Sequence, residues 1–128
     1  MKILLVDDDE GLRSHLAKEL ESRAFEVLQA QSGDEGLYVY QKNGPWKFVL
    51  SDYRFFPGTK IRNGAELVTA IHAVNPLQQM AIMTSDPQRA RRKLPKVLRH
   101  LPVLRKPFRL EEVLRLLRQP VLPLGSLN

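Results

Sequence analysis

Lys47-Phe48-Val49-Leu50-Ser51-Asp52 is a short apolar run that ends in a carboxylate. A run of this length with β-branched and aromatic members predicts a buried strand over residues 47–52. The residues that follow include Pro57 and Gly58, which break regular structure, because proline lacks a backbone donor and glycine permits positive φ. We therefore expect Asp52 at the carboxyl end of a buried strand, which is where open α/β sheets bind their ligands.

The length of 128 residues indicates one domain, and a hydrophobic content of 43% suffices for a packed core. The chain has no cysteine, which excludes disulfides and thiolate chemistry. Its opening apolar run, Ile3-Leu4-Leu5-Val6, is followed at once by three aspartates, so it is neither a signal peptide nor a membrane span. We expect a cytoplasmic protein without a membrane-spanning segment.

The order of the predicted elements indicates the fold class. Apolar patterning predicts strands at residues 2–7, 25–30, 47–52, 80–83 and 101–105. Helices are expected at residues 10–22, 33–41, 65–74, from Pro87 onward, and 110–118, with Pro95 shortening or bending the fourth. This alternation predicts an α/β fold, a doubly wound parallel sheet with helices on both faces. Residues 1–119 form the predicted domain, and residues 120–128 a C-terminal tail or linker stub.

Polar side chains are expected to gather at one edge of this sheet. Asp7 and Asp8 follow the first strand, Asp52 ends the third, Thr84 follows the fourth and Lys106 follows the fifth. Clustered carboxylates repel and raise each other's pKa unless a cation neutralises them. Mg²⁺ suits such an oxygen site, which keeps several waters and can bind a phosphate. The lysine would counter the remaining charge, and the threonine can donate a hydrogen bond to an anionic oxygen.

Five pieces of sequence, in this order, resemble the receiver domain of the two-component response regulators. They are Ile3 to Asp9 with Arg13 beyond, Leu50-Ser51-Asp52, the loop from Pro57 to Asn63-Gly64, Met83-Thr84 and Lys106-Pro107-Phe108. The resemblance covers nearly the whole chain, and the spacing of 22 residues from Thr84 to Lys106 is typical of that family. It implies a flavodoxin-like five-stranded sheet with the order 2-1-3-4-5.

The resemblance also implies a phosphoacceptor function in a two-component phosphorelay. Asp52 would take a phosphoryl group from a sensor histidine kinase or a phosphotransfer protein and form an acyl phosphate. Asp8, Asp52 and the backbone carbonyl of Arg54 would bind Mg²⁺ directly, and Asp7 would help, often through water. Lys106 would neutralise charge on the transferring phosphoryl oxygens.

In the same family Thr84 would hydrogen-bond the attached phosphoryl group and draw the next loop inward, which alters the surface around the last two helices and the fifth strand. The implied function is signalling by altered protein binding and not enzymatic turnover, with Mg²⁺-dependent self-phosphorylation and autodephosphorylation.

Three departures from the family pattern stand near the acceptor. Gly64 follows Asp52 by twelve residues, a longer segment than is usual, so the loop is either a flap or kinase-discriminating loop or a tolerated surface insertion. Val103 stands where the family usually has Tyr or Phe, and it has no ring to rotate, so output coupling must be weaker or carried by loop movement. Arg54 and Asp86 occupy positions that tune hydrolysis of the phosphoryl group, and we hypothesise that they pair over the site.

A second surface is predicted from charge. The net charge is +6, yet residues 87–110 hold nine Lys or Arg and no acid, while the rest of the chain holds eleven against fourteen acids, a balance of −3. This segment maps to the output surface that the resemblance implies. Its predicted partner-binding residues are Arg89, Arg91, Arg92, Lys96, Arg99, Arg105 and Arg109.

A face of one sign repels its own copy, so we predict a monomer, or a dimer formed through another surface. An acidic protein partner is favoured over nucleic acid or an anionic membrane. Residues 87–107 hold no aromatic side chain on which bases could stack, which argues against single-stranded nucleic acid.

The sequence argues against two other function classes. A Mg²⁺-dependent phosphohydrolase usually has a second acid two residues past its nucleophile, where this chain has Arg54. A degenerate receiver would act as a phosphorylation-independent interaction module, against which the intact acidic set argues. A stand-alone receiver and a receiver cut from a larger protein both stay open.

Overall fold

The computed structural model describes residues 1–55 and 60–119, and a five-stranded sheet forms its centre. Within them, the strands are β1 (Lys2–Val6), β2 (Glu26–Ala30), β3 (Phe48–Asp52), β4 (Met80–Thr84) and β5 (Val103–Arg105). They form one sheet of parallel neighbours in the order β2-β1-β3-β4-β5, which confirms the predicted fold class and order. The chain reverses its direction of winding between β1 and β3, which is where such sheets bind ligands.

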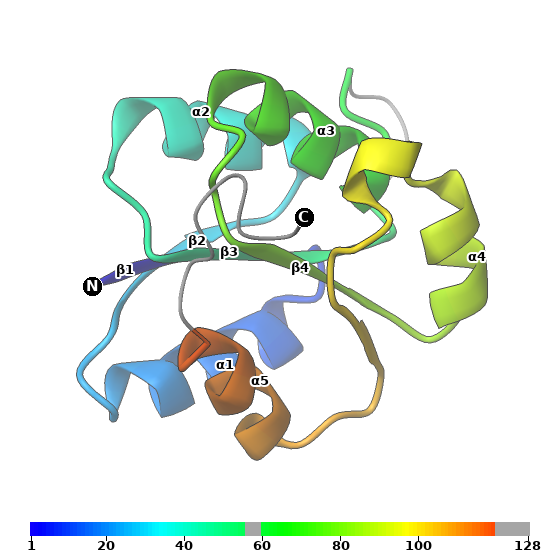
Figure 1. Ribbon diagram of the computed structural model, residues 1–128. Coiled ribbons are helices and arrows are strands. Elements are labelled where there is room, and N and C mark those ends of the chain that lie inside the picture. Colours follow the sequence, from blue (N-terminus) through cyan, green and yellow to red (C-terminus); the bar gives the residue numbers. More distant parts are fainter. Residues whose placement is uncertain (56–59, 120–128) are drawn as a thin grey trace.

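Helices cover both faces of the sheet (Figure 1). The helices α1 (Glu10–Glu21) and α5 (Leu110–Leu117) lie on one face. The other face carries α2 (Gly33–Lys42), α3 (Gly64–Val74) and α4 (Pro87–Lys93), and the short 3₁₀ helix η1 (Lys96–Leu98) follows α4. A side-chain oxygen caps the first turn of each of α1 to α4, because the residue before the helix is Asp9, Ser32, Asn63 or Asp86.

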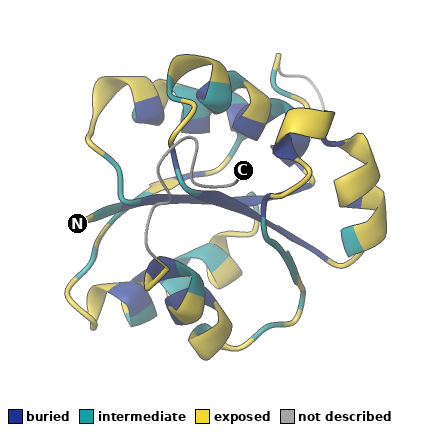
Figure 2. Cartoon of the chain, in the orientation of Figure 1, coloured by how far each residue is buried: buried dark blue, intermediate teal, exposed yellow. Residues whose placement is uncertain are grey.

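Strand alternation divides the apolar core into two layers. Leu4 and Val6 of β1 pack toward α2 and α3, whereas Ile3 and Leu5 pack toward α1 and α5. Every residue of β3 is buried, as expected for a strand covered on both faces (Figure 2). Each fully buried leucine contributes about 2 kcal/mol of hydrophobic stabilisation, so burial on both faces stabilises the sheet that positions the residues at its edge.

The boundaries differ from the predictions mainly on the β5 side. The strand predicted over residues 101–105 begins only at Val103, because Pro102 has no N–H and the Leu101 N–H donates to the Leu98 carbonyl at 3.1 Å. The prediction that Pro95 shortens the fourth helix is confirmed, since α4 ends at Lys93. The predicted tail at 120–128 lies outside the described residues, and the domain boundary stays a prediction. No helix in the described ranges is long and apolar enough to cross a membrane.

Candidate functional site

Three carboxylates meet where β1 and β3 lie side by side. Asp7 and Asp8 follow β1, and Asp52 is the last residue of β3. One carboxylate oxygen from each lies within 4.8 Å of the other two. Asp7 and Asp52 are buried and Asp8 is half-buried, so the group opens to solvent on the Asp8 side. The predicted convergence of these acids is present in the structure.

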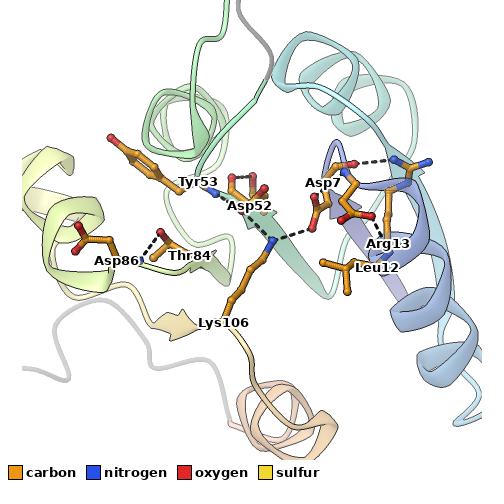
Figure 3. Close-up of polar contacts among 10 residues, drawn as sticks. Asp7, Leu12, Arg13, Asp52, Tyr53, Thr84, Asp86 and Lys106 are labelled. Carbon is orange, nitrogen blue, oxygen red and sulfur yellow. Dashed lines mark hydrogen bonds and ion pairs between the residues drawn. The ribbon is translucent and has the colours of Figure 1, made fainter.

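Lys106 joins two of the acids (Figure 3). Its Nζ lies 3.1 Å from Asp7 Oδ2 and 3.2 Å from Asp52 Oδ1. The Lys106 backbone N–H donates to the Thr84 carbonyl at 2.8 Å, which fixes the end of β5 against the end of β4. The lysine is therefore held by both its backbone and its side chain at the acidic group.

The crowding of charge shifts the pKa of several of these groups. Burial and, next, the nearby Asp7 carboxylate raise the pKa of Asp52 to about 6, although Lys106 opposes the rise. Burial and Asp7 also raise the pKa of Asp8. Burial disfavours the charge of Lys106, but the Asp52 and Asp7 carboxylates outweigh it and raise the pKa of the ammonium. The site therefore holds more negative charge than one lysine neutralises.

This donor set fits a hard divalent cation. Carboxylate oxygens are the ligands that Mg²⁺ prefers, and the half-buried Asp8 leaves room for the waters that Mg²⁺ retains. A cation bound there would relieve the repulsion that raises the pKa of Asp52 and Asp8.

The Thr84 side chain contacts the backbone of Asp86 (Figure 3). The buried Thr84 Oγ1 accepts a hydrogen bond from the Asp86 N–H at 3.1 Å, which leaves the hydroxyl proton able to donate. The Asp86 carboxylate caps α4 by accepting from the Arg89 N–H at 3.1 Å. Within the described residues it forms no ion pair with Arg54, so the hypothesised pair over the site is wrong for this structure. The start of α4 takes the carboxylate instead.

Arg54 follows Asp52 by two residues, and Val103 precedes Lys106 by three. The Arg54 backbone forms an isolated antiparallel bridge with Asn63, and its side chain is exposed. Val103 is half-buried and packs into the core layer beneath α2, α3 and α4. Gly64 closes the loop behind Asp52: a Cβ at this position would lie 2.4 Å from the Asp52 carbonyl oxygen, so only glycine fits.

The far end of the long loop is tied to α2. The Asp34 carboxylate accepts from the backbone N–H groups of Lys60 at 3.1 Å and Ile61 at 2.8 Å. Ile61 also packs on Gly33, where a Cβ would lie 2.4 Å from the Ile61 Cγ2. Sequence reasoning missed this anchor, because an acid in the first turn of a helix predicts only favourable contact with the helix dipole.

Two further features beside the acids were not predicted. The Arg13 guanidinium donates to the Asp7 carbonyl at 2.7 Å, so α1 helps to hold the end of β1 (Figure 3). A pocket of about 400 Å³ lies between α1 and the segment after β5, with Asp7, Lys106, Leu12 and Phe108 among its lining residues. Leu12 is exposed there, although its spacing with Leu16 and Leu20 is that of a packed helical stripe.

The basic residues predicted as a partner surface are all exposed. They lie on α4, on and after η1, at the end of β5 and before α5: Arg89, Arg91, Arg92, Lys96, Arg99, Arg105 and Arg109. None of them forms an ion pair within the described part of the chain.

The fold and the acidic group define an α/β domain with three carboxylates and a lysine gathered at the carboxyl edge of its sheet, a set that fits a divalent cation. The response regulator receiver domain family matches residues 3–118, and the chain belongs to that family. Its members are phosphoacceptor domains of two-component signalling. Nothing favours the degenerate alternative.

Relatives agree with this assignment. The chain is 36% identical over 83 residues to the transcriptional regulatory protein GlrR of Escherichia coli, a match that covers 65% of this chain and 18% of GlrR. It is 34% identical over 82 residues to the photosynthetic apparatus regulatory protein RegA of Cereibacter sphaeroides, covering 64% of this chain and 42% of RegA. The chain thus spans less than half the length of the curated relatives that it matches.

Solved structures show the same architecture. The receiver domain of HemR from Leptospira biflexa superposes with a TM-score of 0.77 at 28% identity, covering 93% of this chain and 95% of that domain. The chemotaxis protein CheY4 of Vibrio cholerae gives a TM-score of 0.75 at 25% identity, covering 94% of this chain and 98% of CheY4.

Proposed function

We propose that Asp52 is the phosphoacceptor of this receiver domain and that its donor is a phosphohistidine of a sensor histidine kinase or phosphotransfer protein. The observation that supports it most is the placement of Asp52 at the end of β3, with Lys106 Nζ at 3.2 Å and the Asp7 and Asp8 carboxylates beside it. Members of this family interact with such kinases and phosphotransfer proteins.

In the proposed transfer, a carboxylate oxygen of Asp52 attacks the phosphorus of the phosphohistidine. The new O–P bond forms as the P–N bond breaks, and the bonding pair returns to the imidazole, which takes up a proton. The Lys106 ammonium is close enough to Asp52 to bind an oxygen of the transferred group. The Thr84 O–H, whose oxygen accepts from the Asp86 N–H, would donate a hydrogen bond to another of these oxygens once the acyl phosphate has formed.

Asp8, Asp52 and the Arg54 carbonyl are the groups that would hold Mg²⁺ directly, with Asp7 acting through water. A bound Mg²⁺ supplies positive charge to the phosphoryl oxygens during transfer. The same residues would support self-phosphorylation from small phosphodonors and autodephosphorylation by water. Arg54, Asp86 and Val103 remain proposed tuning positions, although Arg54 and Asp86 would have to act separately.

An acidic partner protein would bind the basic surface, and phosphorylation would change the strength of that binding. We also propose that the domain is a monomer and that it works in the cytoplasm, as predicted from its sequence.

The test is intact-mass analysis after incubation with acetyl phosphate and Mg²⁺. Wild type is expected to gain the mass of one phosphoryl group, and Asp52→Asn to gain none. Asp9→Asn is the matched control, because asparagine also caps helices and Asp9 caps α1 from outside the acidic group. A phosphoryl group that still attaches to Asp52→Asn would overturn the assignment, as would a wild type that never gains one.

A further inference from the structure

One part of the basic surface, the exposed Lys and Arg residues on and around α4, η1 and β5, forms a pocket. A hollow of about 560 Å³ lies between α4 and the chain after η1, lined by Pro87, Gln88, Arg91, Arg92 and Arg99. Its volume falls within the range of about 300–1,000 Å³ that is usual for ligand pockets. It shares no lining residue with the acidic group, so it is a separate site.

The local sequence explains why a pocket forms there. Residues 87, 88, 91 and 92 recur at helical spacing and so present one face of α4, while Ala90 and Leu94 are buried against the core. Pro95 ends the helix, and the chain turns through η1 to bring Arg99 back beside α4. The turn thus places the guanidinium of Arg99, which follows η1, beside those of Arg91 and Arg92 on α4.

Two of the three arginines are held in place by neutral groups. The Arg91 guanidinium donates to the carbonyls of Arg99 and Leu101, the latter at 3.1 Å. Arg99 Nε donates to the Leu94 carbonyl at 3.3 Å. Carbonyl partners orient a guanidinium without cancelling its charge. Arginines that are oriented before binding lose less conformational entropy when a ligand arrives.

The charge in this pocket has no counterpart within the described residues. No ion pair includes Arg91, Arg92 or Arg99, and residues 87–110 contain no acid. The groove on the other side of α4 differs, because Glu66 lines it together with Arg89 and Lys93. Of these two surfaces of α4, the pocket beside η1 is therefore the one that lacks a negative group.

We propose that the pocket between α4 and η1 binds carboxylate side chains of an acidic segment on a partner protein. Guanidinium groups bind carboxylates through paired N–H donors, which suits a cluster of three arginines. A single-stranded nucleic acid is disfavoured, because no aromatic residue lines the pocket to stack a base. The proposal rests on the proposed function only in treating this surface as the one that partners bind.

The experiment measures binding of a fluorescein-labelled oligoglutamate peptide by anisotropy, with the unphosphorylated full chain at low salt. Arg92→Gln and Arg92→Glu are the first variants, since no hydrogen bond of the Arg92 side chain within the described residues would be lost. Arg99→Gln is the second site. We expect binding to weaken about tenfold in Arg92→Glu and less in the two neutral variants. Amide NMR signals of Gln88, Arg92 and Arg99 should shift as the peptide is added.

Arg23→Glu is the matched control, because it makes the same change of charge at an exposed residue between α1 and β2, and β2 is the edge strand opposite β5. It should leave peptide binding within about twofold of wild type. If it weakens binding as much as Arg92→Glu, the attraction is one of net charge and the pocket proposal fails. A thymidine oligonucleotide of equal length that binds more tightly through the same arginines would overturn the choice of partner.

The outcome can be separated from that of the phosphoacceptor assignment. A wild type that gains a phosphoryl group but shows no arginine-dependent peptide binding overturns only the pocket. Arginine-dependent binding without any phosphoryl gain overturns only the role of Asp52.

Discussion

As the proposed phosphoacceptor, Asp52 must be ionised and buried at once, and the two demands conflict. Burial and the Asp7 carboxylate raise its pKa to about 6, so near neutral pH the folded protein holds an ionised group that it disfavours. Lys106 opposes this shift from 3.2 Å and so favours the ionised carboxylate that the proposed transfer needs. The residue is therefore costly to stability in the absence of a cation, as is common for groups that carry function.

This conflict predicts the effect of Asp52→Asn on stability. The pKa of Asp52 is raised in the folded state from 3.8, so its contribution to stability is present at pH values below 3.8 and is lost as the pH rises through about 6. Asparagine has no charge to bury. In Mg²⁺-free buffer at about pH 7.5, Asp52→Asn should raise the free energy of unfolding by on the order of 2 kcal/mol.

The measurement is urea denaturation at several pH values. The advantage of Asp52→Asn should shrink below about pH 6 and vanish near pH 3.8, where the wild-type group is protonated in both states. Asp9→Asn, which keeps a capping oxygen, should stay within about 0.5 kcal/mol of wild type throughout. An advantage that is the same at every pH would mean that it does not arise from the charge.

Among the elements, the loop between β3 and α3 shows how a departure from the family pattern is accommodated. Its start is tied to its end by the bridge between Arg54 and Asn63, and its far end is tied to α2 by Asp34. Residues 60–63 therefore belong to a fixed part of the fold, whatever the role of the loop in choosing a kinase. The alternatives of a kinase-discriminating loop and a tolerated insertion both stay open.

Asp34→Ala should release this end of the loop. It removes the acceptor of two backbone N–H groups, so we expect a loss of about 1 kcal/mol of stability and faster hydrogen exchange at the Lys60 and Ile61 amides. Asp34→Asn keeps one acceptor oxygen and should have a smaller effect. Glu35→Ala, one residue along the same helix, is the control. Unchanged exchange at both amides in Asp34→Ala would show that the loop is held by other contacts.

At the scale of the whole molecule, the positions of the site residues could be predicted from the sequence because they follow from the topology of the sheet. The alternation of strands and helices places Asp7, Asp8, Asp52 and Lys106 at one edge, because parallel strands all end there. Individual side-chain partners could not be predicted in that way. Asp86 caps the nearest helix and does not reach Arg54, and Asp34 binds a segment 26 residues away without any local signature in the sequence. Topology fixes where strand ends meet, whereas side-chain pairing depends on local competition for donors.

The distribution of charge over the whole molecule predicts its state of association. In a dimer formed through α4, η1 and β5, the exposed arginines and lysines of one copy would face those of the other. Because these charges have the same sign, the two faces repel. We expect a monomer by sedimentation velocity at about 0.1 M salt, before and after phosphorylation. Between about 0.1 and 1 M salt the Debye length falls from about 10 to about 3 Å, so any association through this face should increase with salt. A dimer at low salt that Arg105→Glu abolishes and Arg23→Glu preserves would place the interface on the basic surface and contradict the prediction.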